Sequence, residues 1–241
     1  MPENPKKVTL WIAFAATFTA LTTVATVVLA PPLPAGYFNL GEAVIYLAAL
    51  LLGPITARGT RVPLGALLAG VAGSIGAMLG DIILAPQYIP ATLVLKFVEG
   101  FIAGTLFKHF KSSITEDKLR SGKTTMRVLM SGFLIAAAVI IIGVNYDPGA
   151  TILWIVIGSF FIVVVFVSIL RGKIPIYYMV LSLLAGGVVM FGGYFVYDAF
   201  VLLAAGAAAS LPWNVVQSLV GIIVAIPVYH AVQKAQVLFI Y

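Results

Sequence analysis

A short polar segment, GYFNLGE (residues 36–42), interrupts an almost continuous run of apolar sequence between the first two hydrophobic stretches. It carries two aromatic rings, an amide and a carboxylate at a place where the chain should emerge from a membrane. Polar groups at membrane depth are costly and are usually kept for a task. Because these groups offer stacking and hydrogen bonding, the segment predicts recognition of a small solute from outside.

Further polar side chains lie inside the hydrophobic stretches. Lys96 and Glu99 are spaced i,i+3 on one predicted helix, about 9 to 14 Å from its outer start near Pro90. This spacing allows mutual neutralisation or direct contact with a ligand. Asn214 and Gln217 have the same spacing and could join helices or bind a ligand. The predicted solute-binding residues are Tyr37, Asn39, Glu42, Lys96, Glu99, Asn214 and Gln217.

Other polar and aromatic residues have simpler expected roles. Asp81 and Asp198 end predicted helices at the outer face, where we expect them to meet water. Five aromatic residues fit a belt at the membrane interface, with stacking on a planar solute as the alternative: Tyr37, Phe38, Tyr88, Tyr194 and Tyr197.

The sequence contains no constellation typical of catalysis. His109 and His230 both belong to the predicted inner side, far from the acids, so we expect no metal site. There is no HExxH, no GxSxG and no Gly-rich phosphate loop ending in Lys-Ser/Thr. The chain is therefore not expected to be an enzyme or to hold a cofactor, and uphill transport would draw its energy from a partner or an ion gradient.

Composition determines the class of protein that positions these groups. Of the 241 residues, 62% are hydrophobic and 9% are charged, and none is cysteine. Stretches of roughly 18 or more apolar residues are long enough to cross a hydrocarbon core of about 30 Å. The sequence therefore predicts an all-α polytopic membrane protein of about eight helices. They are expected at 9–30, 42–57, 63–84, 90–107, 127–145, 151–170, 175–197 and 212–233.

The basic residues give a direction to these crossings. Of the 14 basic residues, all except Lys96 fall on one side of the eight-helix map. Since Lys and Arg accumulate in cytoplasmic loops, both termini are expected to be cytoplasmic, in a multi-pass protein of the cell membrane. The basic loop 108–126 is expected to be a solvated linker near lipid headgroups or a docking surface. We expect no nucleic-acid partner, because no basic face with stacking platforms is visible.

Small residues mark places where helices can approach closely. Ala16 and Ala20 stand four residues apart on the first predicted helix, and four glycines line one face of the third: Gly70, Gly73, Gly76 and Gly80. In lipid, such faces favour close helix packing. They are expected to pack within the bundle, and the first could also dock another membrane subunit.

Five segments in order resemble a known family. They are GYFNLGEAVIYLAALLLGP (36–54), LLAGVAGSIGAMLGD (67–81), PATLVLKFVEGFIAG (90–104), GGYFVYDAF (192–200) and LPWNVVQSLVGIIVAIPVY (211–229). Together they are similar to the substrate-binding S component of energy-coupling factor (ECF) vitamin transporters, and most similar to the riboflavin-type members. The resemblance implies high-affinity capture of a vitamin or vitamin precursor at the outer face. It further implies a transmembrane coupling subunit and two cytoplasmic ATPases, which hydrolyse the ATP, and a coupling strip that Ala16 and Ala20 match.

The resemblance also predicts how the chain is organised. The family has a six-helix core, here expected at 1–107 and 172–241, and residues 127–171 supply an extra helix pair after the basic loop 108–126. A self-sufficient ion-coupled secondary transporter is the alternative function, with Lys96 and Glu99 as its proton-coupled pair. That alternative predicts uptake into vesicles without any ATPase.

Overall fold

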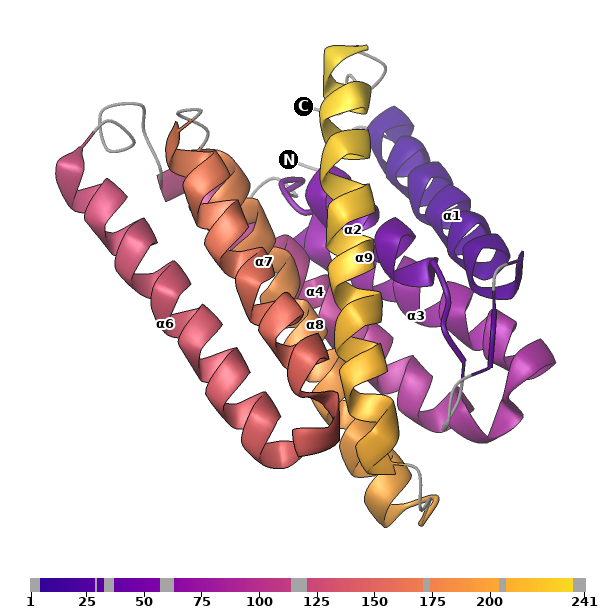
Figure 1. Cartoon of the computed structure of the whole chain (residues 1–241). Helices are drawn as coiled ribbons and strands as arrows, with labels where there is room; N and C mark the ends of the chain where they lie inside the picture. Colours follow the sequence, from indigo (N-terminus) through magenta and orange to yellow (C-terminus); the bar gives the residue numbers. More distant parts are fainter. Residues whose placement is uncertain are drawn as a thin grey trace. The chain divides into compact units, whose positions relative to one another are not determined.

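The structure is a computed structural model that describes residues 5–28, 30–32, 37–56, 63–113, 121–170, 174–203 and 207–235. Within these ranges the secondary structure is helical (Figure 1), apart from an isolated β-bridge between Pro32 and Tyr37. The helices are α1 (Pro5–Val28), α2 (Gly41–Leu52), α3 (Leu64–Leu84), α4 (Ile89–Ser113), α6 (Gly122–Tyr146), α7 (Thr151–Leu170), α8 (Ile174–Phe200) and α9 (Ala207–Lys234). Two 3-10 turns, η1 (Pro86–Tyr88) and η2 (Pro148–Ala150), precede α4 and α7. The all-α class predicted from the sequence is confirmed.

Seven of the described helices are long and apolar enough to cross a membrane. The eighth, α2, has 12 residues, which span about 18 Å at 1.5 Å per residue and fall short of a hydrocarbon core of about 30 Å. The sequence predicted a crossing over 42–57, but the helix ends at Leu52 because Gly53 and Pro54 follow. Gly53 still donates its N–H to the Ala49 carbonyl, but Pro54 has no backbone N–H and cannot continue the helical hydrogen bonding. Ten of the twelve α2 residues are buried, so α2 is a central element of its unit.

Several helices extend beyond their predicted bounds. Helix α4 continues to Ser113 rather than 107, and α9 begins at Ala207 rather than 212. The predicted ends came from hydropathy, which marks where a helix leaves the apolar layer and not where its hydrogen bonds stop. Lysine is a good helix former in water, so α4 runs on through Lys108 and Lys111.

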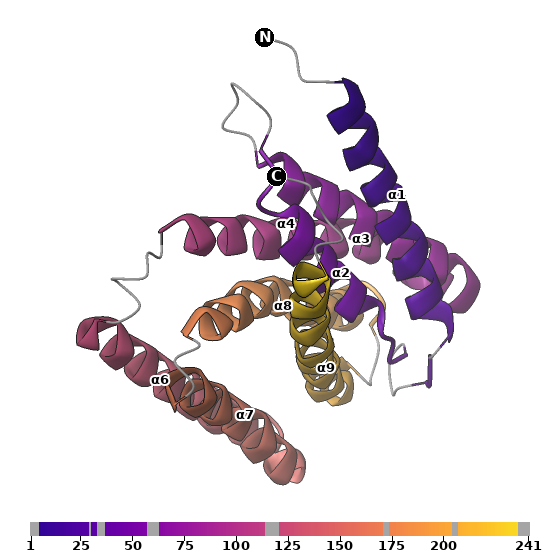
Figure 2. The same cartoon turned by 90° about the horizontal axis from the view of Figure 1, so that it is seen from above.

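The described chain divides into two compact units, residues 1–109 with 181–241, and residues 110–180. In the first unit, α1 lies against α3, and α2 packs against α3 and α9 (Figures 1 and 2). The predicted glycine face of α3 makes this packing possible. A Cβ atom on Gly73 would lie 3.0 Å from Ile45 of α2, and one on Gly76 would lie 2.6 Å from Thr22 of α1. Thr23 also donates a hydrogen bond to the Gly76 carbonyl at 3.0 Å.

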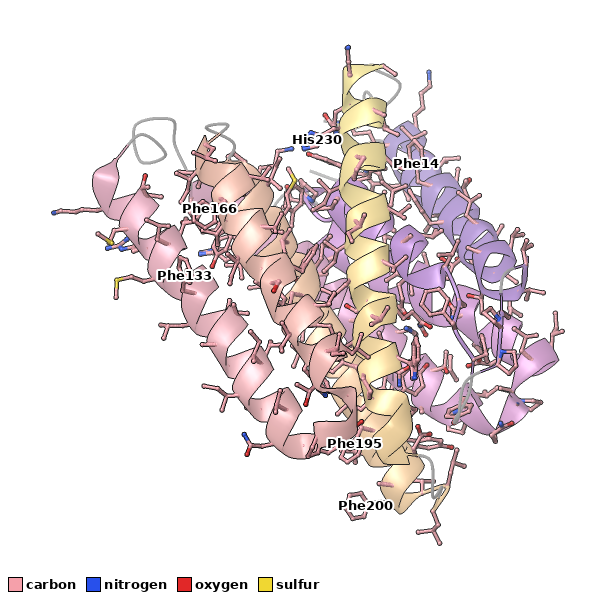
Figure 3. All side chains as sticks on the ribbon, viewed as in Figure 1. Phe14, Phe133, Phe166, Phe195, Phe200 and His230 are labelled. Carbon is pink, nitrogen blue, oxygen red and sulfur yellow. The ribbon has the colours of Figure 1, made fainter. Side chains whose placement is uncertain are left out.

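The second unit contains the hairpin of α6 and α7, joined through η2 (Figure 1). Phe133 of α6 and Phe166 of α7, labelled in Figure 3, meet edge to face with ring centres 6.3 Å apart. The two helices lie within the segment 127–171 that the sequence predicts as an added pair, apart from the first turns of α6. Of the predicted basic loop 108–126, residues 114–120 lie outside the described part of the chain, as do Arg58, Arg61, Arg171 and Lys173.

Large apolar side chains are exposed on all seven long helices. They include Ile12, Ile83, Val94, Leu134, Ile152, Phe200 and Ile223. In water such a surface would be an aggregation hazard, whereas lipid solvates it. The structure therefore supports a multi-pass membrane protein.

Candidate solute-binding site

The first unit contains a hollow lined almost entirely by polar and aromatic side chains. Its empty volume is about 400 Å³, including the part that opens outward, and little of this space is wide enough for a water molecule. The space that a water molecule can occupy is far smaller than the roughly 300–1,000 Å³ of pockets that hold small molecules. Side chains would therefore have to move apart for a bulky ligand. The lining residues are Tyr37, Asn39, Asp81, Tyr88, Lys96, Tyr194, Asp198, Asn214 and Gln217.

Most of the predicted site residues meet at this hollow. Five of the seven line it, namely Tyr37, Asn39, Lys96, Asn214 and Gln217. Glu42 and Glu99 do not line the hollow. They lie beneath its lining, in direct contact with Lys96. The segment 37–42, α4 and the start of α9 thus bring these predicted residues together, although they are as many as 180 positions apart in the sequence.

A buried ion pair network forms the floor of the hollow. Lys96 Nζ contacts Glu42 Oε1 and lies 3.2 Å from Glu99 Oε2. The exposed fraction is 4% for Lys96, 1% for Glu42 and 0% for Glu99. The predicted pairing of Lys96 with Glu99 is present, and Glu42 joins it as a second partner. Since Glu42 is in the first turn of α2, the positive end of the helix dipole also favours its negative charge.

Gln217 connects this floor to the rim of the hollow. Its side-chain nitrogen donates to Glu42 Oε1 at 2.9 Å, and its oxygen accepts from the Asn39 backbone N–H, also at 2.9 Å. Asn39 Oδ1 in turn accepts from the Gly41 N–H at 2.8 Å. One amide of α9 therefore fixes the segment that leads into α2.

A second acid, Asp81, also lines the hollow. It accepts hydrogen bonds from the Tyr37 hydroxyl and from Thr92, whose hydroxyl also lies 2.7 Å from that of Tyr194. Burial first, and then the negative charge of Asp81, raise the pKa of Tyr37 well above its ordinary value. The Tyr37 phenol thus stays protonated at neutral pH and remains a donor.

The expectation that Asp81 and Asp198 meet water is wrong. Asp81 is 4% exposed and Asp198 is 1% exposed. Asp81 does lie in the last turn of α3, but Tyr37 and Thr92 cover it. Asp198 Oδ2 accepts from Ser210 at 3.3 Å. A position at a helix end does not reveal which other segments close over it.

The aromatic belt expected from the sequence is in part a wall of the site. Tyr88 and Tyr194 line the hollow, and their rings meet edge to face with centres 5.9 Å apart. Lys96 Nζ is 5.5 Å from the centre of the Tyr194 ring, within range of a cation–π interaction. The ring centres of Tyr197 and Tyr88 are 6.1 Å apart. The Tyr197 hydroxyl donates a hydrogen bond to the Gln87 carbonyl at 2.8 Å. The segment GGYFVYDAF (192–200) was the available signal for this wall, since it combines two tyrosines with an acid.

The hollow has the means to bind a small solute. Its lining offers carboxylates, amides and phenol rings, which suit hydrogen bonding and stacking. Within the described ranges, no group of three or more His, Asp or Glu side chains could hold a metal ion. His230 lies near the C-terminal end of α9, whereas Phe200 of α8 lies at the other end of this unit (Figure 3).

The predicted coupling residues lie away from the hollow. Ala16 and Ala20 are exposed on α1, one helical turn apart and therefore on one face. The structure leaves this face uncovered by the described residues and accessible to lipid or to another membrane helix.

Comparison with known proteins places this architecture in a family. Residues 6–170 match the family model described as the S component of the ECF-type riboflavin transporter. A protein of Pyrococcus woesei, described as an uncharacterized protein in the gap 3'region, is 31% identical over 138 residues. This similarity covers 54% of the present chain and 76% of the relative. No solved structure matches the chain.

The match to the family covers helices with and without site residues. It includes α1 to α4, which supply Tyr37 to Glu99, and it runs on through the α6–α7 hairpin. It ends before α8 and α9, which supply Tyr194, Asp198, Asn214 and Gln217. The half of the site on α8 and α9 therefore rests on the geometry of the structure.

Proposed function

This chain belongs to the S component family of ECF-type riboflavin transporters, and on that premise we propose that it captures one vitamin or vitamin precursor at high affinity. Capture takes place at the outer face of the cell membrane, and an ATP-driven ECF complex then moves the solute inward. Riboflavin is the first ligand to test, because tyrosine faces and amides suit a flat heterocycle.

The observation that carries the proposal is the hollow itself. A chain with 62% hydrophobic residues gathers nine polar or aromatic side chains around one space. Two of them, Asp81 and Asp198, are nearly fully buried, and buried charges are costly unless they are paired. Such a cost is readily explained if these side chains serve a ligand, because polar residues within membrane-spanning segments commonly mark a solute site.

The binding residues have distinct proposed roles. Asn39 and Asn214, half-buried at the hollow, donate and accept hydrogen bonds to the ring substituents of the solute. Tyr37 provides a hydroxyl and a ring face at the rim. Gln217, Glu42, Lys96 and Glu99 keep the floor in one arrangement, and Lys96 lines the hollow.

The partners follow from the family and from α1. A transmembrane coupling subunit docks along the face that carries Ala16 and Ala20, which is exposed in the structure. Two cytoplasmic ATPases supply the energy, since the sequence of this chain has no phosphate-binding loop. Both termini lie on the cytoplasmic side, as the distribution of Lys and Arg indicates.

The core of the proposed S component consists of α1–α4, α8 and α9. Contacts from α9 to the start of α2 support this assignment, because Gln217 bonds to Glu42 and to Asn39. Residues 127–171, which contain most of the α6–α7 hairpin, are an addition to the core, and 108–126 form a cytoplasmic loop.

The test is to identify what the purified protein carries. The full chain is purified in mild detergent and denatured, and the released small molecules are examined by absorbance, fluorescence and mass spectrometry. A stoichiometric flavin identifies riboflavin as the solute, and another vitamin keeps the capture function with a different ligand. If the protein is empty and binds no B-vitamin or precursor at micromolar concentration, the proposal is wrong.

A second candidate function is supported by the buried charges. Lys96 between Glu42 and Glu99 is an arrangement that could exchange protons with a solute during transport. A self-sufficient secondary transporter of this kind would take up solute into vesicles that contain only this chain and a proton gradient. The capture function predicts no net uptake in the same vesicles, so one assay separates the two.

A further inference from the structure

We propose that the ligand carries a positive charge, as a protonated amine or a cationic aromatic ring, and that Asp198 is its principal anchor. This inference rests on the proposed function, because it specifies the class of solute for the same site. It departs from riboflavin, which is neutral at physiological pH.

Acids outnumber bases in and beneath the hollow. Glu42, Asp81, Glu99 and Asp198 are all buried in or beneath the hollow, whereas Lys96 is the one basic side chain of this group. Its ammonium contacts Glu42 and Glu99. Among the described residues, neither Asp81 nor Asp198 forms an ion pair. A site with this composition attracts a cation and repels an anion.

Asp198 has hydrogen-bonding capacity that the described residues do not fill. Its side chain is 1% exposed and lines the hollow. Ser210 bonds to Oδ2 at 3.3 Å, and Tyr88 is close enough to interact with the carboxyl group. Oδ1 nevertheless has no hydrogen-bond partner among the described residues. A buried polar atom without a partner is costly, and an N–H group of a cationic ligand would supply one.

Asp81 is better satisfied, which makes it the secondary contact. Its two oxygens accept from Tyr37 and Thr92. Each carboxylate oxygen can accept more than one hydrogen bond, so Asp81 could still face a cation across the hollow. Its negative charge contributes to the attraction even without a direct bond.

The aromatic lining of the hollow also favours a cation. Tyr37, Tyr88 and Tyr194 all line the hollow, and the faces of aromatic rings attract cations. The Tyr194 ring already has Lys96 Nζ 5.5 Å from its centre. Carboxylates among tyrosine rings are a common means of holding a cation that is partly removed from water, and a neutral flavin would leave the acids unpaired.

The experiment compares ligands that differ in charge and little in shape. Pyridoxamine and pyridoxine differ by an ammonium group in place of a hydroxyl, and thiamine adds a cationic ring, with riboflavin as a neutral and biotin as an anionic probe. Binding of each to the full-length protein in detergent is measured by calorimetry. We expect the cations to bind as a class, with pyridoxamine at least tenfold tighter than pyridoxine or thiamine at least tenfold tighter than riboflavin.

Two variants locate the preference. Asp198→Asn should reduce the cation preference to threefold or less, and Asp81→Asn should reduce it by a smaller factor. The matched control is Asp147→Asn in the second unit, where Oδ1 accepts from the Gly149 N–H at 3.1 Å. It removes the same charge elsewhere and should leave the preference unchanged. If Asp198→Asn does not fold, Asp81→Asn carries the test.

The outcomes distinguish this inference from the proposed function. Tight binding of a neutral or anionic vitamin, with the cations bound no better, overturns the cation inference and leaves vitamin capture intact. A cation preference that survives both substitutions shows that these acids are not the anchor. Failure of every probe to bind overturns the inference and counts against capture as well.

Discussion

Replacing Lys96 by Met should destabilise the protein strongly, although methionine has a similar shape and suits an apolar bundle. Lys96 is 4% exposed, and it is the base that Glu42 and Glu99 share. Without it, two carboxylates remain buried against each other with no positive charge between them. The folded protein must then tolerate both charges, protonate them, or open the floor of the hollow to water.

The structure gives the size of the effect. A unit charge pair at the 3.2 Å that separates Lys96 Nζ from Glu99 Oε2 attracts by about 5 kcal/mol at an effective dielectric constant of about 20. Removing one member of a buried pair typically costs roughly 3–5 kcal/mol, because the other charge is left unpaired. For a chain of this length, that loss corresponds to a fall in Tm of roughly 6–20 °C.

The matched variant is Glu99→Gln, which removes the other member of the same pair. It leaves Lys96 paired with Glu42, so the charges balance, and we expect a loss below about 1.5 kcal/mol. The triple variant Lys96→Met, Glu42→Gln, Glu99→Gln removes all three charges and should recover much of the stability lost by Lys96→Met alone. Unfolding is followed by tryptophan fluorescence in detergent.

Equal effects of Lys96→Met and Glu99→Gln would refute this reasoning. They would mean that the network acts as a set of ordinary hydrogen bonds rather than as two acids neutralised by one base. Failure of the triple variant to recover stability would lead to the same conclusion.

Three further predictions test the site and its coupling. Ala16→Trp should block assembly with the coupling subunit and leave ligand binding intact, and co-purification with the ECF module measures this. Leu10→Trp, on another face of α1, is the control and should change neither assembly nor ligand binding. Gly221→Ala should lower Tm, because the new Cβ would lie 2.7 Å from Glu42 Cβ, whereas Gly192→Ala meets nothing within 4 Å and should be neutral or slightly stabilising. Tyr37→Phe should weaken ligand binding about tenfold and cost roughly 1.5–3 kcal/mol in unfolding experiments, since it removes a hydrogen bond to a buried carboxylate.

Sequence patterns predicted the helices well because a membrane-spanning helix is encoded by one contiguous stretch of apolar residues. A stretch of some 20 apolar residues has few alternatives in lipid, and the predicted bounds of α7, 151–170, coincide with the observed helix. The exception is α2, whose apolar run of 42–57 continues through Gly53 and Pro54. Hydropathy measures only how apolar a stretch is, so it did not predict that the helix ends at Leu52, before Gly53 and Pro54.

The site was predictable where the signal is local and not where it depends on packing. Lys96 and Glu99 are one helical turn apart, so their pairing follows from spacing alone. The contact of Lys96 with Glu42 joins residues 54 positions apart. The burial of Asp198 depends on which other segments lie over it, and no spacing rule reports that. Neither could be derived without the fold.

The short helix α2 explains why the site has a fixed floor and a separate rim. Because α2 is too short to span the membrane, its first turn lies within the unit and places Glu42 against Lys96. One turn further on, the Tyr46 hydroxyl lies 2.7 Å from that of Ser218 on α9, within hydrogen-bonding distance. Gly221 lets α9 approach at this level, since a side chain there would clash with Glu42. The rim, by contrast, comes from the segment before α2 and is held through the Asn39 N–H by one amide of Gln217. A ligand can therefore reshape the rim at the cost of a few hydrogen bonds, whereas reshaping the floor would break a buried charge network. It follows that substitutions at the rim should change which solute binds, and substitutions at the floor should change whether the protein folds.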